Sequence, residues 1–169
     1  MAHLEHLSDS AVQRQAEAAI IAAAADSLGL DLLASPGRIT LAGDVWVEVD
    51  ARALDSSVFV EAYARQGPLK GAQLKKIGQD ILKLALLQRE STFSGSRAII
   101  AFASDEARDS VRGWLRRAAD AFGVELLVVP IPEVLRNEIL AAQSRQMMEN
   151  IDVTLADVAE DVEPDTGPT

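Results

Sequence analysis

Two consecutive segments in which apolar and polar residues alternate constrain the fold of this chain most strongly. They run from Val45 to Ala53 and from Val58 to Arg65, and in each of them almost every second residue is apolar. Alternation with a period of two is typical of a β-strand that turns one face toward a core. Because Asp55 and Ser56 provide turn residues between the segments, we predict an antiparallel hairpin.

The length of the turn determines which residues of the hairpin face each other. A two-residue turn places Asp50 opposite Glu61. The other pairs on that face are Glu48 with Tyr63, Trp46 with Arg65, and Arg52 with Phe59. The opposite face of the hairpin is apolar. Its residues are Val45, Val47, Val49 and Ala51 on the first strand and Val58, Val60, Ala62 and Ala64 on the second. Carboxylates about 5 Å apart repel each other. The pair is reasonable if a cation lies between them, and a solvated face with Arg52 or a lysine nearby is the alternative.

The other elements follow from periodicity, caps and turn residues. We predict four helices: Ala11–Leu28, about Ala72–Arg89, a helix from Ser104 to Gly123, and one from Pro132 to about Met148. Ser10 and Gln13 form a capping box for the first helix, and Ser104 caps the third. The further strands are Arg38–Ala42, Arg97–Ala103 and Val124–Val129. Strands joined by short turns should be antiparallel, and strands separated by a helix should be parallel. The expected fold is α/β, a three-layer α-β-α sandwich with a mixed sheet, in a single domain over residues 1–148.

Composition excludes several kinds of chemistry. The chain has 169 residues with no cysteine, and its only histidines are His3 and His6, so we expect no thiolate nucleophile, no cysteine-ligated zinc and no serine triad. There is no apolar run of 18 residues and no pattern of a secretory signal, so we expect a cytoplasmic protein without a membrane segment.

Charge is distributed unevenly along the chain. The net charge is −10, but residues 149–169 contain seven acids and no base, which leaves −3 for residues 1–148. The segment Ala62–Arg89 has six bases and one acid, a local charge of +5. The acidic segment is expected to be a flexible, solvated tail, and competition with a ligand for a basic groove is the other interpretation.

Three segments resemble the PD-(D/E)xK, or restriction-endonuclease-like, superfamily. GDVWVEVDA (Gly43–Ala51) is similar to the strand with the first acid of the family, VFVEAYARQG (Val58–Gly67) to its hxExK strand, and QLKKIGQDILKL (Gln73–Leu84) to the helix that follows. The resemblance covers about residues 11–104 and implies a restriction-endonuclease-like fold. The stretch Val58–Leu84 also resembles one in uncharacterised actinobacterial proteins, which implies no function.

The resemblance implies roles for particular residues. Asp50 and Glu61 match the acids that bind Mg or Mn, Glu48 is a third carboxylate on the same face, and Asp44 is a competing match for the first acid. Tyr63 stands where the family has lysine. Lys70 or Lys76 is a possible substitute, since the family tolerates a lysine from a nearby element. The predicted catalytic set is Asp50, Glu61, Tyr63 and Lys76, and the predicted metal ligands are Asp50, Glu61 and Glu48.

Two functions remain open from the sequence, so the chain is not assigned as an enzyme. The first is a divalent-metal-dependent nuclease, a hydrolase in which a metal-bound water attacks a phosphodiester of DNA or RNA. Nucleic-acid phosphates would meet Arg65, Lys70, Gln73, Lys75 and Lys83. The alternative is a catalytically inactive, nuclease-like binding or regulatory module. A third interpretation is an unrelated interaction protein that forms a homodimer through its last helix (Val134, Leu135, Ile139, Leu140, Met147).

Overall fold

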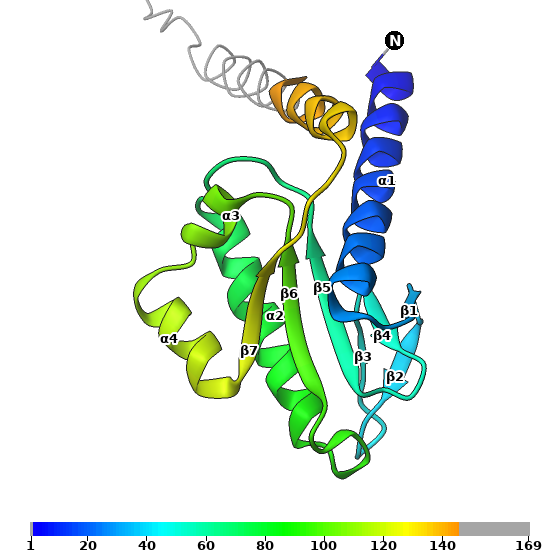
Figure 1. The fold of residues 1–169 in the computed structure, drawn as a ribbon, viewed down its shortest axis with the longest axis vertical. Helices are drawn as coiled ribbons and strands as arrows, with labels where there is room; N and C mark the ends of the chain where they lie inside the picture. Colours follow the sequence, from blue (N-terminus) through cyan, green and yellow to red (C-terminus); the bar gives the residue numbers. More distant parts are fainter. Residues whose placement is uncertain (1, 146–169) are drawn as a thin grey trace, which may run out of the picture.

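The computed structural model describes residues 2–145, in which seven strands form two sheets (Figure 1). The larger sheet has the order β1-β4-β5-β6-β7, and a two-stranded sheet pairs β2 with β3. The strands are β1 (Leu32–Ala34), β2 (Arg38–Thr40), β3 (Trp46–Glu48), β4 (Ala51–Ala53), β5 (Val58–Tyr63), β6 (Arg97–Phe102) and β7 (Val124–Val128). Pairing is antiparallel from β1 to β5 and parallel from β5 to β7, so the larger sheet is mixed as predicted.

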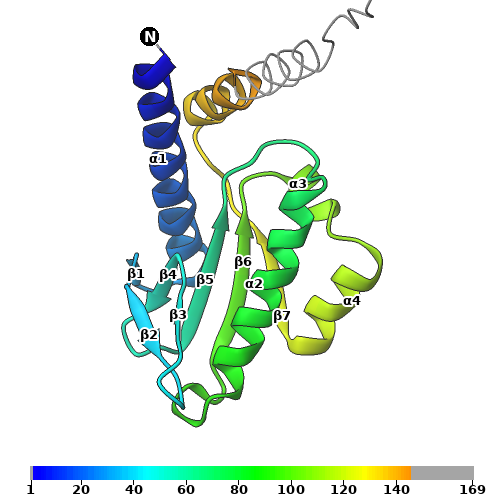
Figure 2. The ribbon, with the colours of Figure 1, turned by 180° about the vertical axis from the view of Figure 1, so that it is seen from behind.

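Helices cover both faces of this sheet (Figures 1 and 2). The long helix α1 (Ala2–Leu28) and the helix over residues 133–145 lie on one face, and α2 (Ala72–Arg89) and α4 (Gly113–Phe122) lie on the other. The short helices α3 (Asp105–Asp109) and η1 (Ser91–Phe93) flank β6. The predicted three-layer α/β arrangement is therefore confirmed. No helix within residues 2–145 is long and apolar enough to cross a membrane.

The predicted strand Val45–Ala53 is wrong, because the chain leaves extended pairing at Val49 and Asp50. Its first part, β3, pairs with β2, and its second part, β4, pairs with β5 and β1. Trp46 therefore lies opposite Thr40, not Arg65, and Glu48 opposite Arg38, not Tyr63. The predicted pair of Arg52 with Phe59 is confirmed.

The break also changes which face the valines occupy. Val47 and Val49 pack in the core beneath α2, whereas Ala51 packs beneath α1. The prediction that these residues share one face is wrong. The physical reason is burial: with the break, each half of the segment places its apolar residues in a different core, while Val45 stays 51% exposed.

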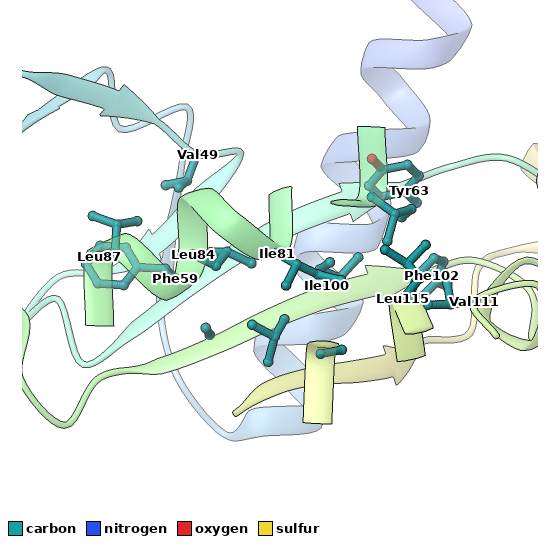
Figure 3. Close-up of a cluster of buried hydrophobic side chains, with 14 of the residues drawn as sticks. Val49, Phe59, Tyr63, Ile81, Leu84, Leu87, Ile100, Phe102, Val111 and Leu115 are labelled. Carbon is teal, nitrogen blue, oxygen red and sulfur yellow. The ribbon is translucent and has the colours of Figure 1, made fainter. Parts of the chain in front are cut away.

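The face of β5 that we predicted as polar is buried. Phe59, Glu61 and Tyr63 are all under 8% exposed, and Figure 3 shows Phe59 and Tyr63 among the side chains packed beneath α2. Phe59 is also in edge contact with Phe93. All six residues of β5 are buried, because a central strand of a three-layer sheet is covered on both sides. The alternative of a solvated face is therefore wrong at Glu61, whereas the lysine that it expected nearby is present as Lys83.

Several boundaries differ from the predicted ones. Helix α1 begins at Ala2, so Ser10 lies inside the helix and not at its start, and β1 was not predicted. The predicted helix from Ser104 to Gly123 is two helices, α3 and α4, separated before Gly113, which has a positive φ of 59°. The cap itself is confirmed, since Ser104 Oγ accepts a hydrogen bond from the Ala107 N–H at 3.1 Å.

The helix over residues 133–145 presents only part of its apolar set to solvent. Leu135 and Ile139 are buried in the core beneath α1, whereas Val134 is 71% and Leu140 43% exposed. The predicted dimerisation face thus loses two members to the core, and Met147 lies outside the described residues.

Gly78 in α2 provides a stability prediction. A Cβ at Gly78 would lie 3.5 Å from Leu115 Cδ1, an ordinary van der Waals contact. Because alanine restricts the unfolded chain and fits a helix interior, Gly78→Ala is expected to raise the free energy of unfolding by about 0.5–1 kcal/mol. Urea denaturation followed by circular dichroism would measure the gain, and a loss of stability would show that α2 and α4 have no room for a methyl group.

Candidate functional site

Charged side chains meet in the interior between β5 and α2. Lys83 Nζ lies 2.6 Å from Glu61 Oε1 and 3.0 Å from Asp80 Oδ1. The Tyr63 hydroxyl donates a hydrogen bond of 2.7 Å to Asp80 Oδ2, which Lys76 Nζ also approaches at 3.3 Å. We call these five residues the β5–α2 ion cluster.

Regular spacing assembles this cluster. Glu61 and Tyr63 are two residues apart on β5, so both side chains point toward α2. On α2, Asp80 follows Lys76 by four residues and precedes Lys83 by three, which places all three side chains on one helix face. The exposed fractions of Glu61 and Asp80 are 1% and 4%, so both carboxylates are shielded from water and need their cationic partners.

Asp50 lies beside the cluster, at the start of β4. The pairing of Ala51 with Val60 and of Arg52 with Phe59 is the register that a two-residue turn predicts, and its continuation brings Asp50 next to Glu61. Asp50 Oδ2 accepts a hydrogen bond of 2.8 Å from the Ala62 N–H. The predicted neighbours Asp50 and Glu61 are thus brought together at the break between β3 and β4.

The environment changes how the cluster titrates. Burial, together with the charges of Asp50 and Asp80, raises the pKa of Glu61 to about 8, although Lys83 acts in the opposite direction. Burial lowers the pKa of Lys83, but the carboxylates of Glu61 and Asp80 outweigh burial and raise it above its ordinary value. Burial and the bond to Asp80 also raise the pKa of Tyr63, so its phenol stays neutral.

The predicted set of three metal ligands is not assembled. Glu48 lies on β3 with its side chain 60% exposed, and its Oε1 is 3.9 Å from Arg38 Nε. Among the side chains of residues 11–145, no group of three aspartate, glutamate, histidine or cysteine residues has the arrangement to hold a metal ion. Lys83 stands between Glu61 and Asp80 and supplies the positive charge that we had predicted for Mg or Mn. These residues therefore fit an ammonium better than a divalent ion.

The predicted nucleic-acid residues do not share one surface. Arg65 and Gln73 line a pocket of about 220 Å³, together with Lys76. Lys75 instead lines a groove between α2 and α4, and Lys83 is only 25% exposed within the ion cluster. Lys70 is exposed in the turn before α2, where its N–H donates to Gln73 Oε1 at 3.0 Å.

The pocket lies at the carboxyl end of β5, and we call it the β5-end pocket. Its walls come from α1, β5, α2 and the helix over residues 133–145, and it is lined by Val12, Gln13, Glu17, Ala62, Tyr63, Ala64, Arg65, Gln73, Lys76, Ile139, Ala142 and Gln143. Arg65 is half-buried, and its Nε is shielded from solvent without a hydrogen-bond partner in the described part of the chain. The side-chain amide of Gln143 makes its hydrogen bonds within the protein: its oxygen accepts from the Gln66 N–H, and its nitrogen donates to the Gln66 carbonyl.

Sequence reasoning missed Asp80 and the position of Lys83. A signal for both was present, because Asp80 is the single acid in the basic segment Ala62–Arg89 and stands at helical spacing from Lys76 and from Lys83. A lone acid on the apolar side of an amphipathic helix predicts a buried ion pair with a facing strand.

No protein-family model, curated protein or solved structure matches this chain. The resemblance to the PD-(D/E)xK superfamily therefore stays a prediction, and function has to be proposed from the site.

Proposed function

We propose that this chain is a non-catalytic module with a restriction-endonuclease-like fold that binds nucleic-acid phosphates at the β5-end pocket. The observation that carries the proposal is Arg65, whose half-buried guanidinium lines the pocket while its Nε lacks a partner. Because no acid pairs with Arg65 among the described side chains, an anion in the pocket would compensate a half-buried positive charge. The planar fork of arginine suits the oxygens of a phosphate.

Nearby groups favour an extended polyanion over a small anion. Lys76, with its side chain 57% exposed, lines the same pocket, and the exposed Lys70 lies on the connection that leads from β5 into α2. Glu17 also lines the pocket and limits its positive charge. A strand that places successive phosphates near Arg65, Lys76 and Lys70 would gain more from this arrangement than a single phosphate would.

The state of the acids argues against cleavage. Glu61 is 1% exposed, does not line the pocket and is held by Lys83. A phosphodiester bound at Arg65 would therefore meet the neutral Tyr63 phenol and not a carboxylate with a metal.

Titration of labelled oligonucleotides tests the binding function. Single-stranded DNA, double-stranded DNA and single-stranded RNA of about 20 nucleotides would be followed by fluorescence anisotropy at several salt concentrations. We expect binding by at least one of them, with Arg65→Gln raising Kd about tenfold and reducing the magnitude of the salt slope by about one. Arg117→Gln is the matched control, because Arg117 is exposed on α4, away from the pocket. Failure of all three probes to bind, or equal losses in both variants, would refute the proposal.

A metal-dependent nuclease is the second candidate, and one observation favours it. A lysine does accompany Glu61, because Lys83 of α2 provides from the helix the ammonium that Tyr63 cannot provide from the strand. A divalent ion would then have to bind Asp50 and Glu61 in competition with Lys83. For this candidate we expect Mn²⁺ or Mg²⁺ to raise Tm in the wild type and not in Glu61→Gln. No rise at millimolar metal, together with intact oligonucleotides after incubation, would exclude it.

A further inference from the structure

Large apolar side chains are exposed together where α2 packs against α4. Leu82 is 62%, Trp114 78% and Phe122 37% exposed, and they line a groove of about 600 Å³. Its other walls are Leu74, Lys75, Gly78, Gln79, Ile81, Ser110, Arg112, Leu115 and Ala118. None of the elements within residues 2–145 covers these three side chains. An apolar groove of this size on a surface is typical of a docking site.

The polar rim of this α2–α4 groove is cationic. Lys75 and Arg112 line it, and no aspartate or glutamate does. Lys75 makes no ion pair among the side chains of residues 11–145. Arg112 Nε donates to the backbone carbonyl of Asp109, whose carboxylate also interacts with the charge of Arg112. The groove therefore combines an apolar floor with positive charge that an acidic partner would complement.

A second copy of the same face is a poor occupant. Face-to-face pairing of two grooves would bring Lys75 and Arg112 of one copy close to those of the other, and like charges at an interface are unfavourable. The occupant should instead carry carboxylates between apolar side chains.

We propose that the α2–α4 groove binds the acidic segment of the same chain, residues 149–169. This segment contains seven acids and no base, and its apolar residues are interspersed among the acids, as Ile151, Val153, Leu155, Val158 and Val162. The apolar floor of the groove is thus matched by the apolar residues of this segment, and the cationic rim is matched by its acids. This inference does not depend on the proposed binding of nucleic acid.

Chain length permits the contact. Residues 146–169 are 24 residues, which fully extended span up to about 80 Å. A compact domain of about 145 residues has a radius of gyration of about 15 Å and hence a radius of about 20 Å, so a path over its surface to the opposite side is about 60 Å, within that reach from Arg145. Tethering also gives an effective concentration in the millimolar range, so a weak contact suffices for occupancy.

Tryptophan fluorescence of the full chain provides the test. In a Trp46→Phe background, the emission reports Trp114 alone, since the chain has only these two tryptophans. Replacing the seven acids of residues 149–165 by their amides is expected to shift the emission to longer wavelength, because Trp114 returns to water. Lys75→Glu with Arg112→Glu should produce the same shift. Arg14→Glu with Arg136→Glu is the matched control, which should leave the emission unchanged, because both residues are exposed and neither lines the groove.

A peptide of residues 149–169 adds a second readout. Added to the full chain with the amidated segment, it should restore the emission, and with Lys75→Glu and Arg112→Glu also present its Kd should rise about tenfold or more. If the emission wavelength of Trp114 does not change on the amide substitutions, or if the peptide fails to bind, the proposal is overturned. A shift that depends on chain concentration, with dimers in light scattering, would assign the groove to a second copy and overturn it as well.

Discussion

Replacement of Lys83 by methionine is expected to lower the free energy of unfolding by about 3–5 kcal/mol at pH 9. Methionine keeps much of the side-chain volume but removes the ammonium that lies 2.6 Å from Glu61 and 3.0 Å from Asp80. Both carboxylates are nearly inaccessible to water, so neither can be solvated in place of the lost ion pair. Urea denaturation of the wild type and the variant would measure the loss.

The loss should depend on pH in a defined direction. The folded-state pKa of Glu61 is raised to about 8, above its ordinary value of 4.5, so the stability linked to its proton is complete below about 4.5 and is lost as the pH rises from there through about 8. Lys83 lowers this pKa, so its removal moves the decline to still higher pH. At pH 6, which is below this pKa in both proteins, Glu61 is protonated, so the loss of Lys83 leaves no unpaired charge on Glu61. Lys83→Met should therefore be less destabilising at pH 6 than at pH 9.

Lys76→Met is the matched control for this prediction. Lys76 also contacts Asp80, at 3.3 Å, but its side chain is 57% exposed, and an exposed pair contributes about 1 kcal/mol or less. If the two variants lose similar stability, or if Lys83→Met behaves identically at both pH values, the interior ion pair does not hold α2 on β5 as described.

The second large effect is expected at Asp50. Asp50→Ala removes the carboxylate that accepts the Ala62 N–H at 2.8 Å and leaves that donor without a partner, at a cost of about 1–3 kcal/mol. Asp50→Asn keeps an oxygen in the same place and should cost less. Both variants remove a negative charge that raises the pKa of Glu61, so that pKa should fall below about 8 in each.

Thermal or urea denaturation would rank the two Asp50 variants, and carboxyl-carbon NMR would follow the titration of Glu61. Equal losses for alanine and asparagine would mean that the bond to Ala62 contributes nothing. An unchanged titration of Glu61 would mean that Asp50 lies too far from it to act through its charge.

The register of β4 and β5 was accessible to sequence reasoning because it depends on local features. Asp55 and Ser56 form a short turn, Ser56 adopts a positive φ of 59°, and its N–H bonds the Ala53 carbonyl at 2.9 Å. A turn of that length permits a single pairing of the flanking residues. The helix predicted over about Ala72–Arg89 is confirmed for a similar reason, since helical periodicity is repeated along its length.

The break at Val49 and Asp50 was not accessible, because the alternation of residues continues through it without a local signal. Whether Glu48 faces Arg38 or Tyr63 depends on which strand comes to lie beside it. That pairing is determined by burial, because the valines before the break pack in the core beneath α2 and the alanines after it pack in the core beneath α1. For this reason, Glu48 lies opposite Arg38 and does not join Asp50 and Glu61 as the predicted third metal ligand.

The sequence by itself determined the elements whose hydrogen bonds and periodicity are local: the β4–β5 turn, helix α2, the Ser104 cap and the adjacency of Asp50 to Glu61. Only the tertiary structure decided that Lys83, 22 positions beyond Glu61, would neutralise it inside the protein. Burial is the physical reason, since a carboxylate on a strand acquires its partner only when a helix packs over it, and the partner is then whichever cation that helix presents.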